Sequence, residues 1–314
     1  MFVTQKQSLG KRNVEVNSVS TNAINTRVIS IRGGLKVGSG AFVDDETGVA
    51  IGNNASANYR AVAIGENSTA PNSSVAIGNG TTCTNVLSVA IGKSASTEWG
   101  VAVGSGVLYG ARTLGQSAVA IGGSNTGNGA LCESRACVAI GGGYNASGAH
   151  TKAQGGIAIG GSSNGTASYT GGAGSLAIGG GDNTVGAVAT GFGAVAIGGG
   201  TAALDGAQAY GDVAVAIGAG AQATGEGGVA LGVSSSASHD GAVAIGNLAA
   251  SSAANELTIN VSGTATQSLQ TAFATFSSTP PTAGSLAIPN AVGFWRVSIG
   301  GTEYDIPLLN ADST

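Results

Sequence analysis

A four-residue motif, Val-Ala-Ile-Gly or a close variant of it, recurs about thirteen times between residues 49 and 246. The glycines that end successive copies lie 13, 13, 14, 12, 18, 19, 19, 19, 19, 20, 14 and 14 residues apart. Self-similarity at such a period is typical of a solenoid, in which each repeat forms one coil and stacks on the next. The sequence therefore predicts about thirteen stacked coils, with the extra residues of the middle copies forming loops on a constant coil.

The alternation inside each copy indicates a short β-strand, because Val and Ile share one face and the intervening Ala lies on the other. We expect Val and Ile to pile up as the core of the roll, and the Ala column to remain on the outside for contact with sister chains. The glycine is expected to take a positive φ and turn the chain. The residues predicted to have these structural roles are Ile51, Gly52, Ile64, Gly65, Ile77, Gly78, Ile91, Gly92, Ile121, Gly122, Ile140, Gly141, Ile159, Gly160, Ile178, Gly179, Ile197, Gly198, Ile217, Gly218, Ile245 and Gly246.

A second strand is predicted in many repeats from small alternating residues, as in 148–151, 186–189 and 206–209. Two strands and two turns would close one coil. Such a coil buries too little apolar surface to offset the ordering of its backbone, so neighbouring coils must stack.

The segment 88–96, Ser-Val-Ala-Ile-Gly-Lys-Ser-Ala-Ser, resembles the head repeat of trimeric autotransporter adhesins, and the resemblance covers roughly residues 46–250. It implies a left-handed parallel β-roll, three chains side by side, and attachment to matrix proteins or other cells. The expected fold is therefore all-β: an elongated homotrimer of left-handed parallel β-rolls with a small β-rich tip at the C-terminal end.

Members of that family carry a signal peptide, a coiled-coil stalk and a membrane anchor, none of which is identified in this sequence. The same repeat also occurs in phage and other viral fibres, and residues 293–307 are similar to the closing hairpin of many viral tail-fibre proteins. These features favour a virion fibre, either a tail fibre or a tail-associated spike, assembled in the host cytoplasm. The alternatives are a bacterial surface adhesin head, and a capsid fibre or decoration protein without a receptor role.

Three parts of the chain are expected. Residues 1–45 lack the repeat and are interpreted as a segment that docks to other virion proteins or caps the roll, with a disordered leader as the alternative, and residues 46–250 as the roll. Residues 251–314 contain Phe273, Phe276, Phe294, Trp295 and Tyr304 and are interpreted as a trimerisation tip with a short helix near 269–276 followed by a hairpin. The first 36 residues carry a net charge of about +5 but no nucleic-acid motif, so no nucleic-acid partner is expected. No apolar run is long enough to cross a membrane as a helix, and no membrane insertion is expected.

Catalysis needs titratable groups that converge, and the chain has two histidines and 16 scattered acids. We expect no enzyme activity, no catalytic residue, no metal site and no cofactor. Binding to a host glycan or protein is assigned to Tyr109, Tyr144, Tyr169 and Tyr210, which lie in the variable segments between motifs, and to Trp295 in the tip. Alternatively, each Tyr packs over its own loop.

Three cysteines, Cys83, Cys132 and Cys137, match no zinc or redox spacing. They are interpreted as small buried or half-exposed side chains without an assigned role.

Overall fold

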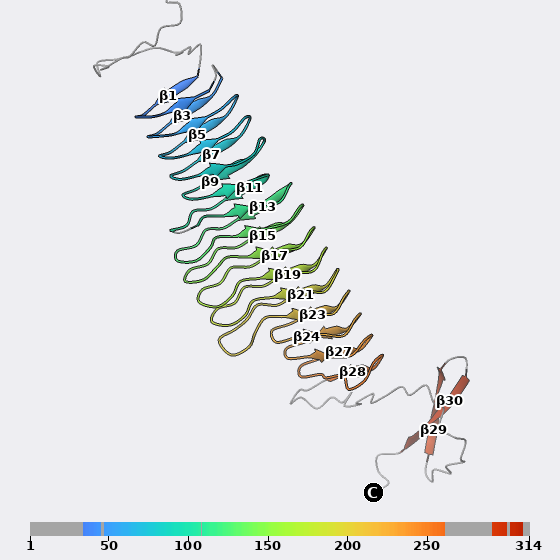
Figure 1. The fold of residues 1–314 in the computed structure, drawn as a ribbon. Coiled ribbons are helices and arrows are strands. Elements are labelled where there is room, and N and C mark those ends of the chain that lie inside the picture. The colour runs from blue at the N-terminus through green and yellow to red at the C-terminus, as the bar shows by residue number, and fades with distance from the viewer. Residues whose placement is uncertain (1–33, 45–46, 108, 261–290, 300–301, 310–314) are drawn as a thin grey trace, which may run out of the picture. The chain divides into compact units, whose positions relative to one another are not determined.

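The computed structural model describes residues 34–44, 47–107, 109–260, 291–299 and 302–309, and these contain strands and turns but no helix. The chain divides into two compact units, Met1–Ala272 and Phe273–Thr314. The described residues of the first unit form a stack of coils in which most coils add one strand to each of two parallel sheets (Figure 1).

The larger sheet, here called the motif sheet, has 15 parallel strands. They are β1 (Leu35–Val37), β3 (Val49–Ile51), β5 (Val62–Ile64), β7 (Val75–Ile77), β9 (Val89–Ile91), β11 (Gly100–Val103), β13 (Ala118–Ile121), β15 (Val138–Ile140), β17 (Ile157–Ile159), β19 (Leu176–Ile178), β21 (Val195–Ile197), β23 (Val215–Ile217), β25 (Val229–Leu231), β27 (Val243–Ile245) and β28 (Leu257–Ile259). Thirteen of them, β3 to β27, are the strands of the thirteen motif copies, and β1 and β28 are additional.

The second sheet, here called the opposite sheet, has 13 parallel strands of two residues each. They are β2 (Phe42–Val43), β4 (Ser56–Ala57), β6 (Thr69–Ala70), β8 (Thr82–Cys83), β10 (Ser96–Thr97), β12 (Arg112–Thr113), β14 (Leu131–Cys132), β16 (His150–Thr151), β18 (Tyr169–Thr170), β20 (Val188–Ala189), β22 (Gln208–Ala209), β24 (Gln222–Ala223) and β26 (Ser236–Ala237). The second strands predicted within 148–151, 186–189 and 206–209 are confirmed as β16, β20 and β22.

Register is constant along the motif sheet. Val62 pairs with Val75, Ala63 with Ala76 and Ile64 with Ile77, and the same pairing of like with like continues through the motif strands. Backbone groups of each coil are thereby satisfied by the coils before and after it.

The expected orientation of the motif is wrong. The Ala residues face the interior and are fully buried, as at Ala63, Ala139 and Ala196, whereas the flanking Val and Ile are half-exposed or exposed. The interior also holds the buried residues of the opposite sheet, such as Ala57 and Thr113. Two short strands enclose a narrow space, and cores pack at near-crystalline density, so mostly small side chains fit. Among the described residues Val43, which faces Gly48, is the one buried aliphatic side chain larger than Ala. The larger apolar residues therefore lie outside.

The glycine that ends each motif has the expected positive φ, as at Gly52 (133°) and Gly65 (129°). A Cβ atom at Gly65 would lie 2.3 Å from the carbonyl oxygen of Gly78 in the next coil. Both the conformation and the close approach of neighbouring coils therefore require glycine.

The roll extends past its expected ends, since β1 and β2 precede the first motif strand and β28 follows the last. In the second unit, β29 (Ala291–Ile299) and β30 (Thr302–Leu309) form the predicted antiparallel hairpin, with Ile299 paired to Thr302. The expected docking segment up to residue 33 and the expected helix near 269–276 lie outside the described residues.

Candidate functional site

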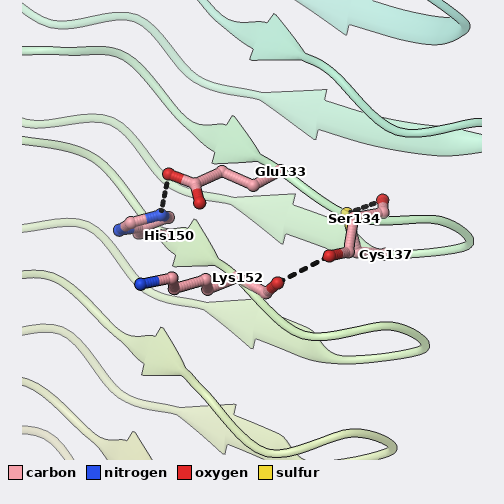
Figure 2. Close-up of polar contacts among 5 residues, drawn as sticks. All are labelled: Glu133, Ser134, Cys137, His150 and Lys152. Carbon is pink, nitrogen blue, oxygen red and sulfur yellow. Dashed lines mark hydrogen bonds and ion pairs between the residues drawn. The ribbon is translucent and has the colours of Figure 1, made fainter.

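Titratable side chains do not converge in the described part of the roll. Among these residues the one contact between a basic and an acidic side chain joins Nε2 of His150 and Oε1 of Glu133, which lie 3.0 Å apart within hydrogen-bond distance (Figure 2). Within the same ranges, His, Cys, Asp and Glu side chains form no group of three that could hold a metal ion. Nor does this part of the chain contain a helix of the length and hydropathy needed to cross a membrane. The surface features that stand out are an apolar face and a set of projecting arms.

The apolar face is the outer side of the motif sheet. Each motif strand from β3 to β27 contributes two large aliphatic side chains to it, and the register places them in two parallel columns along the whole roll. Several of these side chains are more than a third exposed, including Ile91 (37%), Ile121 (40%) and Ile217 (39%). A continuous exposed apolar surface of this kind on one chain indicates a protein–protein interface.

The arms are the longer segments that follow Gly104, Gly122, Gly141, Gly160, Gly179 and Gly198, and together they are called the collar. Figure 1 shows them as long loops that project from one edge of the green and yellow coils. They carry a ladder of their own, in which Gly106 bridges to Ser124, Ser124 to Gly143, Gly143 to Ser162, and Ser162 to Gly181. The collar is thus an ordered third stack beside the two sheets.

Asparagine side chains reinforce this stack. Nδ2 of Asn145 donates to Oδ1 of Asn164 at 2.9 Å, and Nδ2 of Asn164 donates to Oδ1 of Asn183 at 3.2 Å. These three residues are 19 positions apart, one coil each. The side-chain amides therefore form an exposed hydrogen-bonded row along three successive arms.

A groove of about 530 Å³ lies between these arms and the outer side of the opposite sheet. Its lining includes Asn145, His150, Asn164, Tyr169, Val185 and Val188. The rings of His150 and Tyr169 meet edge to face with centroids 5.3 Å apart. The groove thus presents aromatic edges and faces beside amide groups, a combination suited to a ligand with both apolar and hydroxyl surfaces.

The structure does not gather the four predicted tyrosines into one cluster. Tyr109 (51% exposed) and Tyr144 (62% exposed) lie on arms, and Tyr210 (43% exposed) directly follows β22. Tyr169 is half-buried and belongs to β18 rather than to a loop. Burial, and then the charge of Asp205, raise the pKa of Tyr210. Trp295 lies in β29 opposite Ile306, and its side chain is outside the described part.

His150 and the asparagine row were missed as site residues by the sequence reasoning. Their signal is the local period, because His150 and Tyr169 are 19 residues apart, as are Asn145 and Asn164. A 19-residue separation in this region places two residues side by side on adjacent coils.

Comparison with protein families gives one finding. Residues 223–249 match two copies of the YadA head domain repeat, and they include β25, β26 and β27. The match confirms the resemblance to the head repeats of trimeric autotransporter adhesins. No curated protein sequence matches the chain. Because β25 and β27 pair in register within the same motif sheet as the other coils, the architecture of the matched residues continues along the whole roll.

Proposed function

We propose that this chain is the attachment head of a homotrimeric fibre. The observation that carries the proposal is the unbroken double column of Val, Ile and Leu on the outer face of the motif sheet. A single chain leaves these columns in water at a cost of roughly 25 cal/mol for every Å² of apolar surface. Identical chains related by a rotation axis along the roll would cover them completely.

Three chains, rather than two, are proposed because the matched repeat belongs to heads of trimeric adhesins. Association through the aliphatic columns leaves the opposite sheet and the collar accessible. These surfaces then supply the contacts with a host surface, while the roll serves as a rigid support.

The collar groove is the proposed contact site. Tyr169 and His150 offer ring surfaces, and Asn145 and Asn164 offer amide donors and acceptors at its rim. A surface glycan or a protein loop with exposed hydroxyl and apolar groups fits this chemistry. The role is one of binding, and we propose no catalysis, cofactor or metal for it.

We propose further that a virion carries the fibre. The hairpin β29–β30 supports this assignment through its similarity to the closing hairpins of viral tail-fibre proteins. The match to the YadA head repeat favours a second candidate, a bacterial surface adhesin head. Immunogold electron microscopy with an antibody to the roll distinguishes the two, since label on particles supports the first and label on cell surfaces supports the second.

Assembly is tested by light scattering of the purified full-length protein. The expected mass is roughly three times the chain mass of 29.8 kDa. A monomer would contradict the proposal, because the aliphatic columns would then be stable in water.

Binding is tested by adsorption of the fibre to host cells or to a glycan array. Replacing Tyr109, Tyr144, Tyr169 and Tyr210 together by Ala is expected to reduce adsorption at least tenfold. Tyr59→Ala is the matched control, because Tyr59 is 40% exposed but lies outside the collar. Equal adsorption of the fourfold variant and the control would remove the collar from the proposed contact site.

A further inference from the structure

Each coil places two side chains opposite one another inside the roll. One is the inward residue of the opposite sheet, and the other is the residue just before the motif Val, five positions later in most coils. A Cβ atom at Gly48 would lie 2.7 Å from Cγ1 of Val43, and one at Gly156 would lie 2.9 Å from Cγ2 of Thr151. These contacts show that the two positions face each other across the interior.

Cys132 and Cys137 occupy both positions of one coil. Cys132 aligns with Thr113 and Thr151 in the coils on either side, and both cysteine side chains are fully buried. In the described residues no other coil has cysteine at both positions, since the third cysteine, Cys83, faces Ser88. Cys132 and Cys137 therefore occupy the same two positions as the paired residues of other coils, and only their side-chain chemistry differs.

The spacing of the two positions suits a disulfide. In the adjacent coil the Gly156 Cβ position is 2.9 Å from a γ carbon of Thr151. One carbon–carbon bond of about 1.5 Å separates that γ carbon from its own Cβ, so the two Cβ positions are at most about 4.4 Å apart. Cβ atoms joined by a disulfide are about 3.5–4.5 Å apart.

The turn between the two cysteines is anchored independently. Oγ of Ser134 donates to the carbonyl oxygen of Lys152 in the next coil at 2.6 Å, and the Sγ of Cys137 donates to the carbonyl oxygen of Ser134 at 2.8 Å (Figure 2). On the other side, the Sγ of Cys132 donates to the carbonyl oxygen of Val119 at 3.1 Å. In the folded roll these hydrogen bonds hold the backbone that carries the pair on both sides.

We propose that Cys132 and Cys137 form an intrachain disulfide across the interior of this coil when the chain folds in the presence of a small disulfide oxidant such as oxidised glutathione. The Cys137 thiolate attacks the oxidant, and one glutathione leaves as a thiolate. The Cys132 thiol then loses its proton, attacks the mixed disulfide at the Cys137 sulfur and releases the second glutathione. Two cysteine thiols are oxidised, one oxidant disulfide is reduced, and the two protons end on the two glutathiones.

The two thiols have different environments in the folded coil. The neighbouring Cys132 thiol is the largest influence and lowers the pKa of Cys137, while the same interaction and burial raise the pKa of Cys132. Cys137 is therefore the thiol that ionises more readily once the pair has come together, and it is assigned the first attack. Because both sulfurs are fully buried in the finished roll, the oxidant reaches them while the coil is still closing, and the finished bond is protected from reductants.

The experiment counts thiols in the full-length chain refolded with a mixture of reduced and oxidised glutathione. The product is denatured in acid, alkylated and analysed by mass spectrometry. We expect one alkylated cysteine per chain, Cys83, and a 132–137 peptide lighter by two hydrogen atoms that regains them with dithiothreitol. Cys83→Ser is expected to leave no alkylated cysteine.

Three alkylated thiols, or a cross-link that includes Cys83, would overturn the proposal. Circular dichroism of the refolded product checks that the strands have formed. The same count on chain expressed in an oxidising bacterial compartment gives a second result that does not depend on refolding. Neither count depends on the proposed receptor or on the trimer.

Discussion

The hydroxyl of Thr113 donates a 2.6 Å hydrogen bond to the hydroxyl of Thr97 in the preceding coil, and both side chains are fully buried. Removing one partner leaves the other polar group in the interior without this bond. We therefore expect Thr113→Val to lower the free energy of unfolding by about 1–3 kcal/mol. Urea unfolding of both single variants and of Thr97→Val/Thr113→Val tests this, because the double variant should lose less than the two single losses combined. Strictly additive losses would contradict the coupling.

The inward position of the motif Ala gives a second prediction. Ala196 is fully buried between Ala177 and Ala216, whereas Val195 next to it points outward. Ala196→Leu should lower the free energy of unfolding by about 1–3 kcal/mol, because the interior has no room for the larger side chain. Val195→Leu is the matched control and should cost less than about 1.5 kcal/mol. Thermal unfolding monitored by circular dichroism compares the stabilities of the two variants. A greater loss of stability for Val195→Leu would indicate that Val, and not Ala, faces the interior.

The aliphatic columns give a third prediction. Ile217 lies on the outer face of the motif sheet, and Gln222 lies on the outer face of the opposite sheet in the same coil. Ile217→Asp should weaken trimer assembly at least tenfold, since a carboxylate would be buried without a partner. Gln222→Asp should leave the mass unchanged in sedimentation experiments. Equal behaviour of the two variants would mean that the chains associate through another surface.

The end of the roll gives a pH-dependent prediction. Before β28, the carboxylate of Glu256 accepts hydrogen bonds from the N–H and the hydroxyl of Ser252, and from the N–H of Ala253 at 2.8 Å. These bonds lower the pKa of Glu256 in the folded state. The stabilisation is therefore complete above the usual glutamate pKa of about 4.3 and is lost as the pH falls through the lower folded value.

The protection factors of the Ser252 and Ala253 amides, taken against the intrinsic exchange rate at each pH, should fall over that acidic range. Glu256→Gln should have lower protection factors at neutral pH, with no further fall on acidification. The pKa of Glu256 can be measured from the chemical shift of its carboxyl carbon. A pKa equal to that of glutamate in an unstructured peptide would contradict the stabilising role of these hydrogen bonds.

Much of the architecture can be predicted from the sequence because it depends on spacing. The recurrence of motifs such as Val62-Ala63-Ile64 determines the number of coils and the pairing of like residues. Alternation alone shows only that the two faces differ. Which face is inside depends on the width of the interior, and that width is determined by small residues across the coil, such as Ala57. Val62 and Ile64 were therefore assigned to the wrong side.

The collar illustrates the same limit. Spacings of 18 to 20 residues predict added loops. They do not predict that Gly143 bridges to Ser162, because that bridge depends on how two arms pack. Tyr169 was assigned to a loop because its two-residue strand β18 is too short to stand out from a variable segment.

The bridges between arms also constrain how such a head can change length over evolutionary time. Removing part of an arm would break the bridges to the arms on both sides. Removing residues 157–175 would instead pair Leu176 with Val138, in the register that Ile157 now has. Duplication or excision of whole units therefore keeps the strand register, so the length of the roll can change in steps of one coil.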